Sequence, residues 1–433
     1  MKTILDSAFK AWSAAASLRQ RRLRYKNYTY GNQWCDIVKN RAGRYVTERQ
    51  LLEDTGAKPL TNNLIRQLVK TIVGRYRTQA AEAGLYHGEH IAELARRNSL
   101  AELDSRMLEE FLISGCAIQR ISNERRWGGC GVWIDNVDPR SFFVNTFKDP
   151  RGWDIDLIGM LHDMSLPELI NRFAGDSRER AADLRRIYAS ADINGLSANE
   201  LGSANDAGDF FVSNIEGRCR VIEVWTVDCR ENATDADSAS LDFVWHCRYI
   251  APDGTLLSEF DSPYAHHSHP FVVKFYPLTD GEVHPFVEDV IDQQRHINRL
   301  IVMIDKMMTT AAKGVLLFPI DQMVDNMKWD DITSVWAHSD GVIPISGRGD
   351  HLPQQVVTNT ASSGAYQLLE MQMKLFDDIS GVGDALLGRN TQSARGAEVL
   401  ETQVRNATIA LADIFDTFTT FIESRNLKAL TSA

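Results

Sequence analysis

A glycine-rich segment near the carboxyl end is the part of the sequence best suited to bind a phosphate group. The segment GVGDALLGRNTQSARGAEVL spans residues 381–400 and places four residues between its second and third glycines. This spacing approaches that of a P-loop, in which a Lys and a hydroxyl bind nucleotide phosphates and Mg²⁺. Arg389 and Asn390 stand at those two positions here. A helical apolar pattern over residues 365–380 also replaces the strand that precedes a P-loop, so no nucleotide site is expected.

Two further groups of residues could act in metal binding or catalysis. The HHSH stretch offers three imidazoles without a nearby Cys or carboxylate cluster, which favours an exposed loop over a metal site (His266, His267 and His269). Asp154 and Asp156 share one face of a predicted strand, as catalytic carboxylates can, but alternating charge on a solvent face explains them equally well. No nucleophile signature occurs in the sequence. We therefore expect no catalytic residue, no metal and no cofactor.

Composition restricts the classes of partner. The net charge is −11 and the sequence pI is about 5.5, which argues against tight nonspecific clamping of DNA. Six cysteines without C-x-x-C pairs, and no signal peptide or long apolar run, predict a reduced cytoplasmic compartment and no membrane span. One short basic cluster could contact phosphates, end a solvated helix or face a partner (Arg19, Arg21, Arg22, Arg24 and Lys26).

The apolar periodicity predicts an α+β chain that is predominantly helical. Ser165 and Glu168 have the spacing of a capping box, and the last predicted helix has a heptad seam that favours packing within the chain. The predicted helices cover residues 1–26, a segment capped by Asn62, and residues 90–113, 165–191, 286–313 and 394–426. Strands are predicted within residues 117–164 and 218–276.

Six short motifs follow one another in an order that resembles the portal proteins of tailed bacteriophages, especially those of short-tailed phages. Each motif is degenerate by itself, and their shared order over residues 28–421 carries the resemblance. The motifs are TYGNQW, KPLTNNLIRQLVKTIVGRYR, FLISGCAIQR, VDPRSFFVNTFKDPRGWDIDLIGMLHDMSLPELINRF, HPFVEDVIDQQRHINRLIVMIDKM and ISGVGDALLGRNTQSARGAEVL.

The resemblance implies a portal fold with wing, stem helices, a small β-rich clip and a tunnel loop. The chain ends soon after its last helix, so no large C-terminal crown is expected. The implied parts are an N-terminal wing part (1–164), a first stem helix region and loop (165–214), the clip (215–284), a second stem helix (285–314), and a C-terminal wing part (315–433) with the tunnel loop at about 381–396.

The resemblance also implies which residues act. Tunnel-loop side chains would contact DNA, although Arg395 could instead cap or pair within the next helix (Arg389, Asn390, Gln392 and Arg395). Three glycines would give this loop conformational freedom (Gly381, Gly383 and Gly388). The second stem helix would pack through its apolar stripe (Val287, Ile291, Ile297, Ile301, Ile304 and Met308).

The implied function is a portal ring at one capsid vertex, through which double-stranded DNA is packaged and ejected. The expected partners are further copies of the chain, as a dodecamer by resemblance, DNA, the major capsid protein, the large terminase subunit and a head-tail adaptor. The expected location is the virion, with assembly in the host cytoplasm. A head-tail adaptor or other virion ring component, or a metal-dependent DNA-processing enzyme, is the alternative.

Overall fold

The structure is a computed structural model of the 433-residue chain. It describes residues 2–126, 129–189, 209–213, 215–232, 240–313, 315–319, 328–337, 343, 345, 354–356, 363–382, 409 and 411–432. The chain forms two compact units, and each consists of segments that are distant in sequence. The first unit is Met1–Gln33, Asn63–Ile291 and Asp377–Ala433, and the second is Trp34–Asn62 and Asp292–Phe376.

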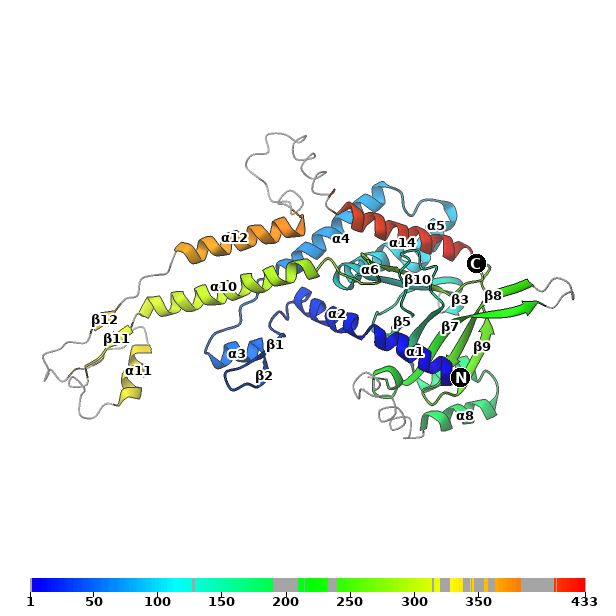
Figure 1. The fold of residues 1–433 in the computed structure, drawn as a ribbon, viewed down its shortest axis with the longest axis horizontal. Coiled ribbons are helices and arrows are strands. Elements are labelled where there is room, and N and C mark those ends of the chain that lie inside the picture. The colour runs from blue at the N-terminus through cyan, green and yellow to red at the C-terminus, as the bar shows by residue number, and fades with distance from the viewer. Residues whose placement is uncertain are drawn as a thin grey trace. The chain divides into compact units, whose positions relative to one another are not determined.

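The first unit is built on two antiparallel sheets with helices around them (Figure 1). One sheet has the strand order β5-β6-β7-β8-β9 and the other β10-β3-β4. The strands are β3 (Cys116–Arg126), β4 (Gly129–Asn136), β5 (Phe142–Val144), β6 (Leu157–Met164), β7 (Cys219–Asn232), β8 (Ser240–Ile250), β9 (Leu256–Asp261) and β10 (Phe271–Phe275). The helices are α1 (Lys2–Ala14), α2 (Ala16–Thr29), α4 (Leu64–Glu82), α5 (Glu89–Asn98), α6 (Leu100–Ser114), α7 (Leu166–Phe173), α8 (Arg178–Ala189) and α14 (Ala412–Leu430).

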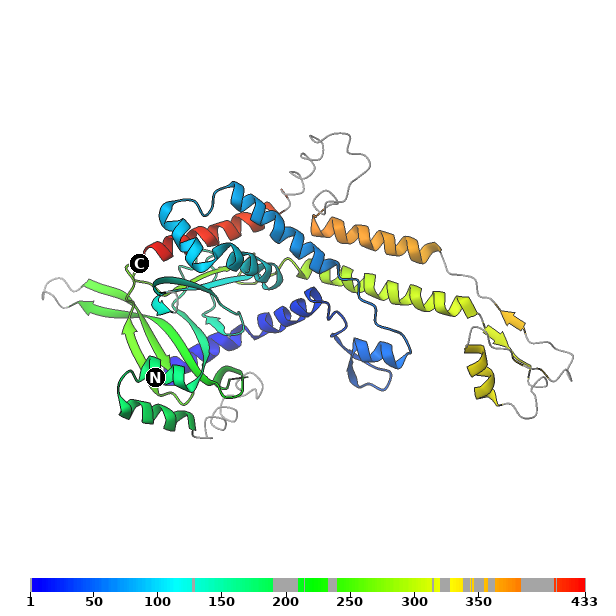
Figure 2. The same cartoon turned by 180° about the vertical axis from the view of Figure 1, so that it is seen from behind.

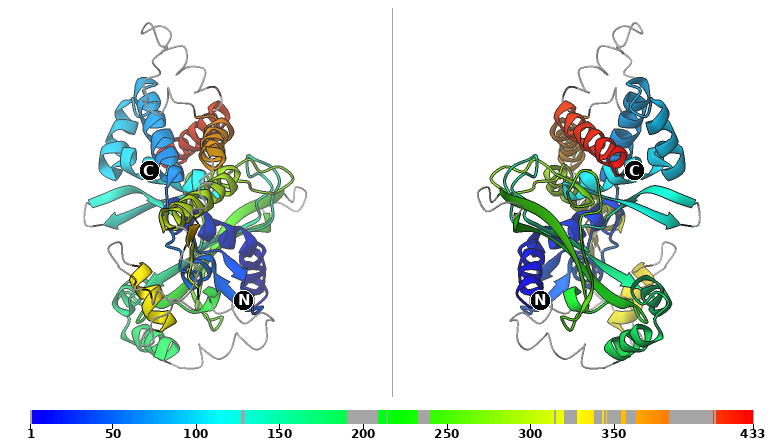
Figure 3. Two further views of the ribbon diagram at one scale, coloured as in Figure 1. Left: turned by 90° about the vertical axis from the view of Figure 1, so that its left-hand side faces the viewer. Right: turned by 90° about the vertical axis from the view of Figure 1, so that its right-hand side faces the viewer.

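The five-stranded sheet buries apolar side chains on both of its faces. Successive strand residues point to opposite faces, so Ile222 and Val224 of β7 pack with α1, whereas Val221 and Trp225 belong to the other core cluster. Helix α1, dark blue in Figure 3, covers the first face through residues such as Trp12. Helices α7 and α8 contribute apolar residues to the cluster on the second face.

Helix α14 packs into the first unit beside α4 and α6 (Figure 2). The described part of the heptad seam is buried, with Phe418 against Tyr76 of α4 and Phe111 of α6. The expectation that this seam packs within the chain is confirmed over residues 411–430. Residues 394–408 of the predicted helix lie outside the described part.

The second unit carries most of the long helix α10 (Glu288–Lys313) and of α12 (Ser363–Ser380). It also contains a hairpin of β1 (Ile37–Lys39) and β2 (Tyr45–Thr47), which leads into α3 (Glu48–Asp54). After α10 come β11 (Val315–Leu317), α11 (Trp329–Ala337) and β12 (Gln354–Val356), with β11 paired antiparallel to β12.

Several predicted elements have different limits in the structure. The helix expected over residues 165–191 is divided into α7 and α8 around Gly175, whose φ of +54° lies in the left-handed region. Ser99, with φ of +51°, similarly divides residues 90–113 into α5 and α6. The capping box of Ser165 and Glu168 is confirmed. The N-cap of α4 is Asn63, one residue after the expected Asn62.

The structure also divides residues 215–284 differently from the expected separate β-rich part. Strand β7 pairs with β6, and β10 pairs with β3, so these strands complete sheets that begin within residues 116–164. A strand requires hydrogen-bonding neighbours, but its sequence does not identify which distant strand provides them. The segment is therefore continuous with the preceding β-rich layer.

A buried ion pair attaches α14 to the first unit. The guanidinium of Arg425 donates to both carboxylate oxygens of Asp104, at 2.8 and 3.1 Å, and both residues are buried. Asp104 also accepts hydrogen bonds from the Tyr86 hydroxyl at 2.8 Å and the Gln119 amide at 3.2 Å. The pair thus connects α14, α6 and β3.

Replacing Arg425 with Met should lower the free energy of unfolding by about 3–5 kcal/mol, because it leaves the buried carboxylate of Asp104 without a cation. Urea unfolding followed by circular dichroism measures the change. Glu423→Gln, at an exposed position of α14, serves as the control. Arg425→Met combined with Asp104→Met should recover part of the loss. An unfolding curve for Arg425→Met that matches the control would contradict the role of the pair.

Candidate assembly site around the long helix

The structure describes only part of the predicted site. The residues Gly383, Gly388, Arg389, Asn390, Gln392 and Arg395 lie outside the described residues. Gly381 directly follows α12 with φ of +65°, a left-handed conformation that suits a glycine after a helix end. The expected helix before the loop is therefore present, and the strand that a P-loop requires is not.

Helix α10 presents its predicted apolar stripe unevenly. Val287, Ile291, Ile297 and Ile304 are buried, and Ile301 is half-buried. Met308, at the far end of the stripe, is 54% exposed. The buried positions keep the helical spacing because residues three and four apart share one face. The proposed packing role of these six residues concerns assembly, and the burial describes the single chain.

Two buried amides of α10 hold the loop before α4. The side chain of Gln294 donates to the Asn62 carbonyl at 2.6 Å and to the Asn298 side-chain oxygen at 3.1 Å. The Asn298 oxygen also accepts the Asn62 backbone N–H at 3.1 Å. Both amides are almost completely buried. These bonds satisfy both backbone groups of Asn62, which would otherwise lose hydrogen bonds to water.

A buried carboxylate reinforces this contact on the next turns of α10. Glu48, at the start of α3, is buried and accepts from Arg295 at 3.0 Å and from Arg299. Arg295 also lies 3.8 Å from the carboxylate of Asp36. Glu48 follows Thr47, which caps α3 with a capping box to Gln50. Residues 36–62 are thereby joined to α10, although more than 230 residues separate them in sequence.

The motifs GNQW and TNN place these groups through local hydrogen bonds. In the first unit, Gln33 donates to the side-chain oxygen of Asn63 at 3.0 Å, and Asn63 accepts from the Arg66 N–H as the cap of α4. In the second unit, the indole N–H of Trp34 bonds to the Thr61 hydroxyl at 3.1 Å. The sequence singled out both motifs for their order, but not their contact with one another or the roles of Gln294 and Asn298.

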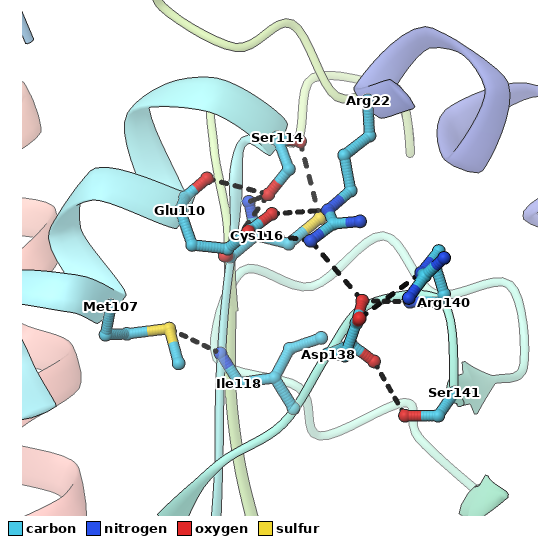
Figure 4. A network of polar contacts seen from close by, with 9 residues as sticks. All are labelled: Arg22, Met107, Glu110, Ser114, Cys116, Ile118, Asp138, Arg140 and Ser141. Carbon is cyan, nitrogen blue, oxygen red and sulfur yellow. Dashed lines mark hydrogen bonds and ion pairs between the residues drawn. The ribbon is translucent and has the colours of Figure 1, made fainter. Parts of the chain in front are cut away.

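The basic cluster of α2 pairs within the first unit (Figure 4). Arg22 is buried, donates to both carboxylate oxygens of Glu110, at 2.5 and 2.8 Å, and lies 3.3 Å from Asp138. Burial acts to raise the pKa of Asp138, but Arg22 and hydrogen bonds from Arg140 outweigh it and lower that pKa. These contacts assign Arg22 to the framework of the unit.

Neighbouring members of the cluster also have partners in the chain. Arg19 lies 3.5 Å from the centre of the Trp12 ring, and Arg21 lies 3.7 Å from Glu288. Arg24 lies over the ring of Tyr28. Such contacts explain the clustering of arginines without a bound phosphate.

The candidate enzymatic residues have structural partners. Asp154 accepts hydrogen bonds from the backbone N–H groups of Lys148 and Asp149, which lower its pKa and close a turn. Burial lowers the pKa of His269 well below its usual range, and its Nδ1 accepts the Phe271 N–H at 3.2 Å. Among the described residues, no group of three His, Cys, Asp or Glu side chains could hold a metal ion.

Replacing Glu48 with Gln should lower the free energy of unfolding by about 1–3 kcal/mol, since it removes a buried acceptor of charged hydrogen bonds. Hydrogen exchange should quicken most in the backbone amides of β1 and β2. Mass spectrometry of exchanged peptides measures this effect. The control Glu53→Gln changes an exposed carboxylate of the same helix. Equal exchange in the two variants would argue against the clamp.

Comparison with known proteins identifies the family. Residues 145–430, well over half of the chain, match the family described as phage P22-like portal protein. The match contains β6 to β10, α10 and α12, and it ends with α14. No curated protein matches the sequence. None of the described helices has the length and hydropathy needed to cross a membrane. The chain therefore belongs to the family of phage P22-like portal proteins.

Proposed function

We propose that this portal protein forms a ring at one vertex of a phage capsid, with about twelve copies as the family resemblance implies. Double-stranded DNA would pass through the ring during packaging and ejection. The ring would contact the major capsid protein, the terminase motor and a head-tail adaptor. The terminase would hydrolyse ATP, and the portal chain would have no catalytic role. The family match carries this proposal.

The exposed face of α12 supports assembly with further copies. Four apolar residues at intervals of three, four and four form a stripe along this helix and are 36–51% exposed (Leu368, Met371, Leu375 and Ile379). Soluble chains rarely leave a continuous apolar stripe in water, and such stripes commonly mark protein interfaces. A neighbouring copy in the ring would cover it.

Helix α10 supports a role as a stem helix. Its 26 residues give a length of about 39 Å at 1.5 Å per residue. The clamp around Glu48 and Asn62 fixes one side of the helix, while Asp292, His296 and Asp305 are exposed. We assign the stem to α10 and α12. The small β11–β12 ladder and α11, which follow α10 in the second unit, are the better candidates for the clip that docks the motor.

Negative-stain electron microscopy of the purified chain should give hollow rings with about twelve subunits, counted in two-dimensional class averages. Met371→Glu combined with Leu375→Glu should reduce the ring fraction strongly, because it places charges in the apolar stripe. Lys374→Glu combined with Glu370→Lys changes exposed positions beside the stripe and serves as the control. A wild-type chain that stays monomeric at micromolar concentrations would refute the proposed function.

We propose further that Arg389, Asn390, Gln392 and Arg395 contact DNA from the tunnel loop, with Gly381, Gly383 and Gly388 giving it freedom. Arg389→Ala should leave ring assembly unchanged and reduce the packaged DNA severalfold, because it removes a phosphate contact. Nuclease-protected DNA in assembled particles provides the measurement. Arg185→Ala, at an exposed position of α8, is the control. Normal packaging with Arg389→Ala would exclude this residue.

A further inference from the structure

The β1–β2 hairpin carries an unusual concentration of exposed positive charge. Residues 37–50 contain four basic residues and one acidic residue, Glu48, in a chain whose net charge is −11. Glu48 is buried and binds Arg295 and Arg299 of α10. The four basic side chains are exposed, and within the described part of the chain no carboxylate forms an ion pair with them (Lys39, Arg41, Arg44 and Arg49).

This arrangement differs from the other basic cluster of the sequence. On α2, Arg22 is paired with Glu110 and Asp138, and Arg21 lies near Glu288. Those charges are compensated within the chain. The hairpin instead keeps its cations in water, where they retain the capacity to neutralise an external anion.

The shape of the hairpin suits a nucleic-acid duplex. Strands β1 and β2 pair antiparallel from Ile37 opposite Thr47 to Lys39 opposite Tyr45. A ribbon of two strands is an element that the major groove of DNA can admit, with its flanking cations against phosphates. The tip residues Ala42 and Gly43 are small, and a Cβ at Gly43 would meet no atom within 4 Å. A phosphate backbone can therefore approach the tip closely.

The turn is held in one conformation. The side-chain oxygen of Asn40 accepts the backbone N–H groups of Ala42, at 3.0 Å, and of Arg44, at 2.9 Å. The Asn40 N–H in turn donates to the Arg44 carbonyl at 2.9 Å. Lys39 lies 5.1 Å from the centre of the Tyr45 ring, which orients its ammonium group. Little additional ordering of the backbone is needed on binding.

We propose that the β1–β2 hairpin binds the phosphate backbone of duplex DNA through Lys39, Arg41 and Arg44. The proposal rests on the proposed function, which brings DNA to this protein. Three phosphate contacts give a slope of about −2.7 for log affinity against log salt, so affinity falls about fortyfold between 50 and 200 mM salt. Such a contact is weak and reversible, as the passage of DNA requires.

Fluorescence anisotropy with a labelled 30-base-pair duplex and the full-length chain tests the site, across about 50–300 mM NaCl. The test variant is Lys39→Gln, Arg41→Gln and Arg44→Gln. The matched control, Lys10→Gln, Arg178→Gln and Arg185→Gln, removes the same charge from exposed helical positions. A second variant, Ala42→Lys, adds one cation at the exposed tip. Circular dichroism and electron microscopy of each variant report folding and ring assembly.

The test variant should weaken binding at least tenfold at 50 mM salt and reduce the magnitude of the salt slope by about 2–3, whereas Ala42→Lys should raise it by about 0.9. The control should bind as wild type does. Equal affinities and slopes for the test variant and the control would overturn the proposal, as would absence of wild-type binding at 50 mM salt. Loss of rings in the folded test variant would instead identify an interface between copies and also overturn it. Failure of the wild type to form rings would refute the proposed function, and the anisotropy would still decide the hairpin.

Discussion

A buried carboxylate between two arginines determines how the second unit is built. Glu48 lies out of water, so it requires cationic partners, and Arg295 and Arg299 of α10 provide them. The amides of Gln294 and Asn298 add the same requirement for the backbone of Asn62. The hairpin, α3 and the loop before α4 therefore depend on a helix that begins more than 200 residues later.

The distribution of charge separates structural cations from available ones. Arginines of α2, α10 and α14 bind carboxylates of their own units, and this binding stabilises contacts between distant segments. The hairpin cations lack such partners among the described residues. An acidic chain with a few available cations suits a phage portal protein, because many strong phosphate contacts would retard the DNA that it must let pass.

The sequence predicted the elements whose signals are local. The apolar period predicted α10 and α12, and the Ser165 capping box was found because its residues are three apart. The partners of Arg22, Glu48 and Arg425 could not be predicted, since an ion pair between distant residues leaves no spacing to recognise. The continuation of the β-rich layer into β7 and β10 was missed for the same reason. The predicted DNA-contacting residues after Gly381 stay predictions.

The interleaving of the two units has a consequence for synthesis. The first unit is completed only by α14, whose Arg425 neutralises Asp104 from the early helix α6. A nascent chain that has not yet released α14 holds that carboxylate without its cation and leaves the aromatic surface of Tyr76 and Phe111 uncovered. Domains usually fold as soon as they emerge from the ribosome. Here folding of the first unit must wait for the end of translation, so truncated chains would not supply a finished subunit.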